Sequence, residues 1–145
     1  YLVDAYCGSG LFCLTAADRF AEVAGIEISE SAIEWARRNA DLNGITNCDL
    51  HAGSAENIFA SVTYANVESS VIIDPPRKGC SAPFIEQLIQ FAPTRIVYVS
   101  CNPSTQIRDL SPLLDAGYAI NRIQPFDLFP QTKHLECVVT LDART

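Results

Sequence analysis

The sequence predicts an α/β fold: a seven-stranded, mainly parallel sheet with helices on both faces and an antiparallel hairpin at its end. Two observations predict it. Short continuous apolar runs, typical of buried parallel strands, alternate five times with segments of helical periodicity. The last two apolar runs are joined by residues 124–135, a connection too short for a crossover helix and typical of a hairpin. The chain has 145 residues, 48% of them hydrophobic, which is enough for one domain with a substantial core.

The strands are expected where apolar, mostly β-branched residues follow one another. The clearest run extends from Ile96 to Val99. Pro75 and Pro76 end the strand before it, because proline cannot donate to a sheet ladder. The seven predicted strands span residues 1–6, 22–28, 47–52, 69–74, 95–100, 118–123 and 136–141.

The helices are expected between these strands. The clearest has a predicted capping box of Ser31 and Glu34 and ends at Gly44. Asn102 and Pro103 supply an N-cap and a first-turn proline for the last helix. The five predicted helices span residues 11–20, 31–43, 55–61, 83–91 and 104–116.

Four candidate functional residues lie where predicted parallel strands end. In α/β sheets, ligands bind outside the carboxyl ends of the strands. The cysteine among the four also precedes a helix N-terminus, whose positive end favours the nucleophilic thiolate. The alternative is inert packing, the usual role of a buried cysteine. The four residues are Tyr6, Glu27, Asp74 and Cys101.

The turn after the first strand has the pattern of a nucleotide-binding site. Gly8 and Gly10 let a ligand approach backbone amides, and Glu27 can accept hydrogen bonds from ribose hydroxyls. The third glycine of the dinucleotide fingerprint is absent, because position 13 is cysteine. The alternatives are a tight strand-to-helix turn and an exposed surface carboxylate.

Asp74 opens a segment that continues with two prolines, Arg77 and Lys78. If its strand neighbours the next one, Asp74 stands beside Cys101. The two cations suit a phosphate backbone at the same rim. The alternative reading is a solvated loop in which Asp74 caps a turn.

Glu136 is the candidate general base. It precedes the apolar pair Val138 and Val139, so it can be part-buried with a raised pKa. His134 would point to the same side if the backbone is extended. Patterning alone favours the alternatives, an edge-strand glutamate and a surface histidine.

Composition argues against several classes of protein. Six cysteines form no C-x-x-C pair and only two histidines are present, which argues against a zinc or iron–sulfur site. No apolar run approaches the roughly 20 residues that span a bilayer. The net charge of −7 argues against non-specific nucleic-acid binding by this domain alone.

Five segments together resemble the RNA 5-methyluridine methyltransferases that use S-adenosylmethionine, the tRNA (uracil-5-)-methyltransferase family, in particular its fungal type. The last three are specific to this family, and the first two are shared by most class I methyltransferases. The segments are Asp4–Phe12, Gly25–Glu27, Asp74–Gly79, Val99–Pro103 and Phe129–Glu136.

The resemblance implies that residues 1–145 form a catalytic domain with the class I methyltransferase (Rossmann-like) fold, the C-terminal part of a longer protein. It implies that Cys101 attacks C6 of a uracil, that C5 takes the methyl group of S-adenosylmethionine, and that Glu136 removes the C5 proton. It assigns the cofactor and base pocket to Tyr6, Gly8, Glu27 and Asp74.

The resemblance also implies RNA, in the first place tRNA, as partner, bound with help from an N-terminal region. It implies a monomer without metal or membrane association, acting inside the cell, in the cytoplasm, nucleus or mitochondrion. Three alternatives stay open. An amino-methyltransferase would use Asp74 and need no cysteine, a binding fragment would lack catalysis, and a nicotinamide enzyme would lack the third fingerprint glycine.

Overall fold

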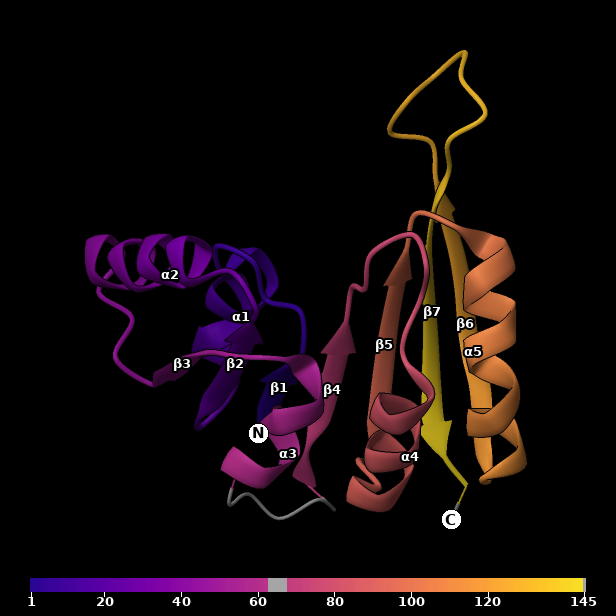
Figure 1. Ribbon diagram of the computed structural model, residues 1–145, viewed down its shortest axis with the longest axis horizontal. Helices are drawn as coiled ribbons and strands as arrows, with labels where there is room; N and C mark the ends of the chain where they lie inside the picture. The colour runs from indigo at the N-terminus through magenta and orange to yellow at the C-terminus, as the bar shows by residue number, and fades with distance from the viewer. Residues whose placement is uncertain (63–67, 145) are drawn as a thin grey trace.

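The computed structural model describes residues 1–62 and 68–144, and their strands form one mixed sheet of seven. The strand order is β3-β2-β1-β4-β5-β7-β6 (Figure 1). The strands β1 to β5 pair in parallel, whereas β7 is antiparallel to both β5 and β6. The predicted fold class, with its terminal antiparallel hairpin, is therefore confirmed. The strands are β1 (Leu2–Asp4), β2 (Val23–Glu27), β3 (Cys48–Ala52), β4 (Ser70–Ile73), β5 (Arg95–Ser100), β6 (Tyr118–Phe126) and β7 (Glu136–Ala143).

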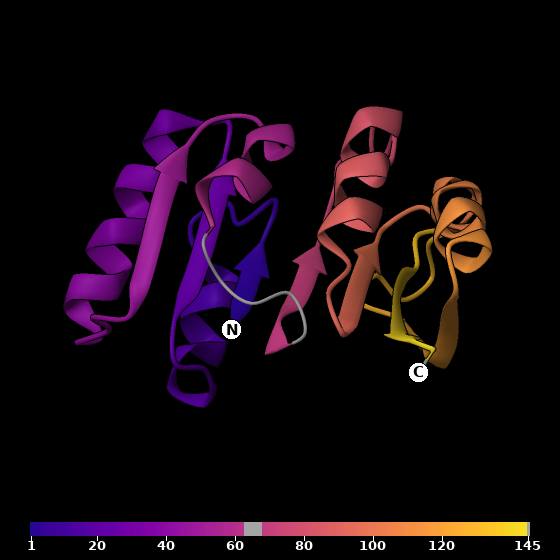
Figure 2. The same ribbon diagram turned by 90° about the horizontal axis from the view of Figure 1, so that it is seen from below.

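Helices cover both faces of the sheet. Figure 2 shows α3, α4 and α5 on one side and α1 and α2 on the other. A short 3₁₀ turn, Ala17–Arg19, follows α1, and another, Ala55–Asn57, precedes α3. The helices are α1 (Leu11–Ala16), α2 (Glu30–Leu42), α3 (Ile58–Ser61), α4 (Ala82–Phe91) and α5 (Pro103–Asp115).

Two core layers result from the period-two alternation of the strands. Leu2 packs with Cys13 of α1 and Ile33 of α2 on one face. The next residue, Val3, belongs to the opposite layer, which contains Phe84 of α4. Helices thus pack against both faces of the sheet. The residues that follow the parallel strands lie together at the carboxyl ends of those strands.

The predicted capping box of α2 is wrong. The N-cap is Ser29, whose Oγ accepts a hydrogen bond from the Ala32 amide at 3.3 Å. Glu27 accepts a hydrogen bond from the Ser29 amide at 2.9 Å and so holds Ser29 in the extended conformation that an N-cap needs. The helix begins at Glu30, which leaves Ser31 inside its first turn.

The terminal hairpin is longer than the sequence predicts. β6 continues to Phe126, which pairs with Glu136, and a register shift between Ile120 and Arg122 interrupts the ladder. Pro125 is tolerated because β6 is the outer strand of the sheet. The hairpin end projects beyond the rest of the domain (Figure 1).

No helix within residues 1–62 and 68–144 combines the length and the hydrophobicity that a bilayer crossing requires. The same residues contain no cluster of three or more histidine, cysteine or acidic side chains arranged for a metal ion.

Candidate active site

A cavity of about 940 Å³ opens where the parallel strands end. Its walls come from the residues after β1, β2, β4 and β5 and from the start of β7. Five of the six predicted site residues line it: Tyr6, Glu27, Asp74, Cys101 and Glu136. The ends of the parallel strands thus bring together Tyr6 and Cys101, 95 positions apart, and the start of β7 adds Glu136 from the terminal hairpin.

Gly8, the sixth predicted residue, lies outside the cavity lining and shapes the turn instead. Gly8 and Gly10 have φ angles of 52° and 93°, in the left-handed region that glycine adopts without strain. The Gly8 amide donates to Glu27 Oε2 at 3.3 Å, and the Ser29 amide donates to Oε1. Glu27 is thereby oriented by two backbone donors while its carboxylate still lines the cavity.

Asp74 lies in the wall next to the nucleophile candidate. Its strand β4 pairs with β5, with Ile73 opposite Tyr98, so Asp74 and Cys101 leave neighbouring strands. Burial and, secondarily, the negative charge of Glu136 raise the pKa of Asp74 to about 6. The two carboxylates are therefore close enough to repel each other across the cavity.

Cys101 is half-buried between β5 and α5. The next residue is the N-cap of α5: Asn102 accepts a hydrogen bond from the Ser104 amide at 3.2 Å. Pro103 is at the first helical position, as the sequence predicts. The thiol lines the cavity and makes no hydrogen bond within the described part of the chain, so it is available to a substrate.

Glu136 is the first residue of β7 and is half-buried in the cavity wall. His134 is not among the described residues that line the cavity. The His134 ring instead lies with Nδ1 2.9 Å from the Arg77 guanidinium and packs edge-on against Phe129.

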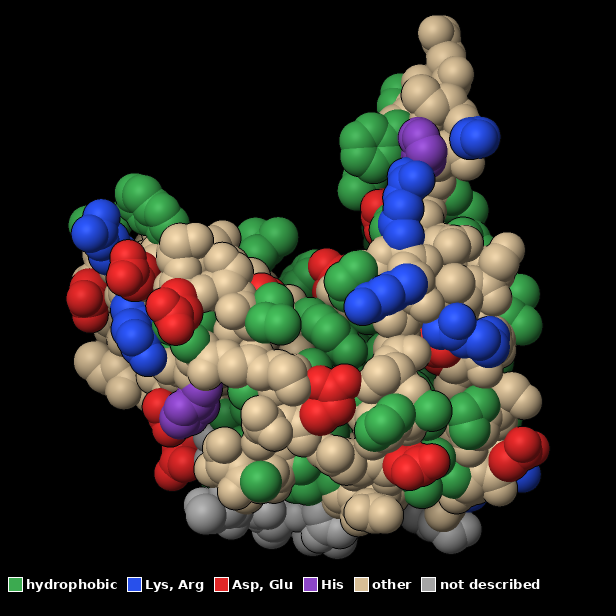
Figure 3. All heavy atoms as spheres, in the orientation of Figure 1, with side chains coloured by type: hydrophobic (Ala, Val, Ile, Leu, Met, Phe, Trp, Pro, Cys, Tyr) green, Lys and Arg blue, Asp and Glu red, His purple; other side chains and the backbone are tan. Residues whose placement is uncertain are grey.

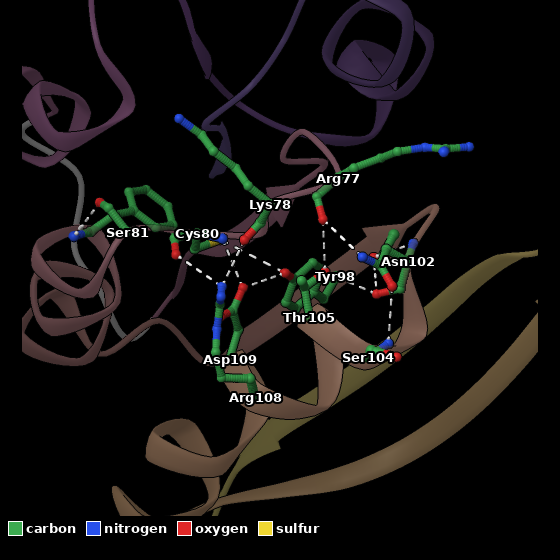
Figure 4. A network of polar contacts seen from close by, with 12 residues as sticks. Arg77, Lys78, Cys80, Ser81, Tyr98, Asn102, Ser104, Thr105, Arg108 and Asp109 are labelled. Carbon is green, nitrogen blue, oxygen red and sulfur yellow. Dashed lines mark hydrogen bonds and ion pairs between the residues drawn. The ribbon is translucent and has the colours of Figure 1, made fainter.

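The loop between Asp74 and α4 is fastened to α5 by its backbone (Figure 4). The Arg77 carbonyl accepts hydrogen bonds from Asn102 Nδ2 and Thr105 Oγ1, at 3.0 and 3.1 Å. The Lys78 carbonyl accepts one from the Arg108 guanidinium at 2.9 Å. The loop that follows Asp74 and the helix that follows Cys101 are thus one connected unit.

Asp109 is the buried centre of this network, and sequence reasoning missed it. It accepts hydrogen bonds from the Cys80 amide and the Tyr98 hydroxyl, each at 2.7 Å, and from Arg108 Nε at 2.8 Å. Burial and the Asp109 charge raise the pKa of the Cys80 thiol to about 12, which keeps it protonated. A sequence signal existed: Gln106 and Asp109 interrupt the apolar stripe that continues at Leu110 and Leu113.

Asp4 is a second buried carboxyl that the site prediction omitted. It is fully buried, and its Oδ2 accepts a hydrogen bond from the Cys13 amide at 3.2 Å. Its Oδ1 has no partner among residues 1–62 and 68–144. Burial raises the pKa of Asp4 from 3.8 to about 7.

We expect Asp4 to make folding less favourable as the pH rises from about 4 to 7. In this range the unfolded carboxyl is ionised while the folded one keeps its proton, so the unfolded chain binds fewer protons. At about 1.4 kcal/mol per pKa unit, the free energy of unfolding falls by up to roughly 4 kcal/mol. Urea unfolding between pH 4.5 and 8 measures this loss.

Asp4→Asn is expected to remove most of that pH dependence and leave a smaller decline from Asp74, whose pKa is also raised. Asp18→Asn, at an exposed carboxyl, is the control and should retain the wild-type slope. An unchanged slope in Asp4→Asn would show that other groups cause it.

Comparison with known proteins decides the family. The family model described as tRNA (Uracil-5-)-methyltransferase matches residues 1–144. The chain belongs to this family. It is 46% identical over 145 residues to the tRNA (uracil(54)-C(5))-methyltransferase of Schizosaccharomyces pombe, and 43% identical over 143 residues to that of Saccharomyces cerevisiae. These matches cover 97% and 95% of this chain but only 28% and 22% of the relatives.

A solved family structure shows the same fold. The tRNA (uracil-54, C5)-methyltransferase of Pyrococcus abyssi, in complex with S-adenosyl-L-homocysteine, superposes with a TM-score of 0.81 at 37% identity. The match covers 97% of this chain and 33% of that one. The predicted class I methyltransferase fold is therefore confirmed for this member of the tRNA (uracil-5-)-methyltransferase family. The chain spans about a fifth to a third of the length of the relatives compared.

Proposed function

We propose that this protein transfers a methyl group from S-adenosylmethionine to C5 of a uridine in RNA, in the first place tRNA, through a covalent bond between Cys101 and C6 of uracil. The observation that carries the proposal is the meeting of Cys101, Asp74 and Glu136 in one cavity. The family and the relatives' names support the substrate and reaction class.

The residues at the β1 and β2 ends fit S-adenosylmethionine, which is cationic and carries a ribose. Glu27 is held by two backbone amides in an orientation that leaves lone pairs for ribose hydroxyls. Gly8 and Gly10 form a left-handed turn beside the cavity and place no side chain there. Tyr6 and Phe12 contribute aromatic side chains to the cavity wall. When bound, the cofactor supplies an electrophilic methyl group.

Cys101 acts first on the base. Its thiolate adds to C6 of uracil, and the electron pair of the C5–C6 double bond moves toward C5 and the C4 carbonyl. C5 becomes enolate-like and accepts the methyl group, which leaves C5 with both methyl and hydrogen. Because the reacting atoms lie in the plane of the base, the uridine must leave its stack to reach the cavity.

Glu136 then accepts the C5 proton, and the C6–S bond breaks to regenerate the Cys101 thiolate and the double bond. Asp74 lies in the same wall, where its carboxylate can accept the N3–H of uracil. The proton, the electron pair and the leaving thiolate are thus all accounted for within the cavity.

The decisive test uses RNA containing 5-fluorouridine, because fluorine at C5 is not removed as a proton. We expect a persistent covalent adduct when the intact protein is incubated with this RNA and S-adenosylmethionine, and mass spectrometry should locate it at Cys101. Cys101→Ser should abolish the adduct, whereas the control Cys48→Ser, at a part-exposed thiol outside the cavity, should retain it. Full methylation by Cys101→Ser would contradict the covalent step and revive the amino-methyltransferase alternative.

A further inference from the structure

The hairpin end, residues 126–135, carries a row of exposed apolar side chains above the cavity. Phe126, Leu128 and Phe129 are 45%, 62% and 50% exposed. Phe126 and Leu128 line the cavity, so the row begins at its mouth and leads away from it. Side chains of this size are rarely left in water in such a group without a partner.

A turn fixes this row in place. The Thr132 amide and hydroxyl both donate to the Phe129 carbonyl, at 3.1 and 2.7 Å, and the His134 amide donates to Thr132 Oγ1 at 3.2 Å. Phe129 is therefore held at the start of a closed turn, with its ring edge against His134. Because the turn is already closed by these hydrogen bonds, binding a partner would cost little conformational entropy in this segment.

Cationic side chains accompany the row. Lys133 belongs to the hairpin end, and Arg77 is joined to it by its contact with His134. Figure 4 shows Arg77 and Lys78 extending away from the network that holds their backbone. Figure 3 shows Lys and Arg side chains and a histidine gathered along and below the hairpin on the face in view. None of the three cations has a carboxylate within 4 Å in the described ranges. Hydrogen bonds from Ser54 and Ser81 mainly lower the pKa of Glu56, and the charge of Lys78 contributes least.

We propose that Phe126, Leu128, Phe129, Arg77, Lys78 and Lys133 form an RNA-binding surface, the hairpin surface, which holds the nucleotides next to the uridine in the cavity. This inference rests on the proposed function. Bases of an unpaired strand stack on the exposed rings, since every base has a π-face. The cations neutralise the phosphates on the side of the same strand.

The charge of the hairpin surface favours RNA as its ligand. The domain as a whole carries −7, so a polyanion is repelled except where cations gather without acidic partners. Within residues 126–135, Asp127 and Lys133 balance each other, and Arg77 and Lys78 of the neighbouring loop supply the excess positive charge. A protein partner would need neither unpaired cations nor flat rings at the mouth of a cavity for a flipped base.

RNA binding by the intact protein, measured by fluorescence anisotropy across a salt series, tests the hairpin surface. Lys133→Ala is expected to weaken binding severalfold and to reduce the slope of log K against log salt by about 0.7, one phosphate contact on a single strand. Phe129→Ala is expected to weaken binding about tenfold with an unchanged slope, because stacking involves no counterion release. Phe129→Tyr retains the ring and should bind like the wild type.

Arg38→Ala is the matched control, because Arg38 is an exposed cation that lies over Trp35 on α2, on the far part of the sheet. It should leave both affinity and salt slope unchanged. S-adenosylmethionine affinity, measured in every variant, shows that the fold and the cofactor site are intact.

The two proposals fail in different ways. If the wild type forms 5-methyluridine but Lys133→Ala and Phe129→Ala bind RNA as it does, the hairpin surface is refuted and the proposed function stands. A Lys133→Ala variant that loses affinity without a change in slope refutes the phosphate contact. If the wild type methylates no uridine, the proposed function fails whatever the hairpin variants do.

Discussion

Glu136→Gln is expected to lower the turnover of RNA methylation by about 10²- to 10⁴-fold while the first methyl transfer still takes place. Glutamine has the shape of glutamate but does not accept the C5 proton, so elimination stops and Cys101 stays bonded to the base. With RNA that contains ordinary uridine, the variant should therefore accumulate a covalent adduct methylated at C5, with a burst of one methyl group per protein. Rapid-quench kinetics and mass spectrometry measure both.

The matched control is Glu34→Gln, at an exposed glutamate on α2, which should retain wild-type turnover. Near-normal turnover by Glu136→Gln would instead mean that another base removes the proton. Asp74 would then be the candidate, because its carboxyl lies in the same cavity and has a pKa of about 6.

Asp109→Ala is expected to lower the free energy of unfolding by about 2–6 kcal/mol, about 1–3 kcal/mol for each of the two buried donors that lose their acceptor. The substitution leaves the buried Tyr98 hydroxyl and the Cys80 amide without their acceptor. Chemical denaturation measures the change. Asp115→Ala, at an exposed aspartate of the same helix, should stay within about 0.5 kcal/mol of the wild type.

A double-mutant cycle with Tyr98→Phe shows whether the loss comes from the network. Removing the hydroxyl removes one of the groups that Asp109→Ala leaves unsatisfied, so the double variant should be more stable than additivity predicts. Additive losses would mean that Asp109 and Tyr98 stabilise the protein independently.

The elements that the sequence predicts best are those whose signals are local. β5 is predicted at its exact bounds, because a continuous apolar run is followed at once by an N-cap and a proline. The end of β1 is predicted too long, because the apolar residues Ala5 and Tyr6 follow it after ladder pairing stops. The cap of α2 is missed because two serines stand two positions apart, and the contact with Glu27 selects the first.

The residues of the site also differ in whether a local sequence signal predicts them. Strand ends locate Glu27, Asp74 and Cys101 from sequence, whereas Glu136 needed the family resemblance because the hairpin has no such rule. Asp109 meets Cys80 across 29 positions, and Asp4 meets Cys13 across nine. Such partners are chosen by tertiary packing, which single-sequence patterns do not contain.

The register shift in β6 has a consequence for assembly. β6 is an edge strand of the sheet. The unpaired N–H and C=O groups of a long, regular edge strand could pair with a strand of another molecule. The register shift between Ile120 and Arg122 makes this edge strand irregular. Arg122 adds a charge to the strand, and Pro125 lacks a backbone N–H near its end. The hairpin can therefore reach far out of the domain without becoming a seed for intermolecular sheets.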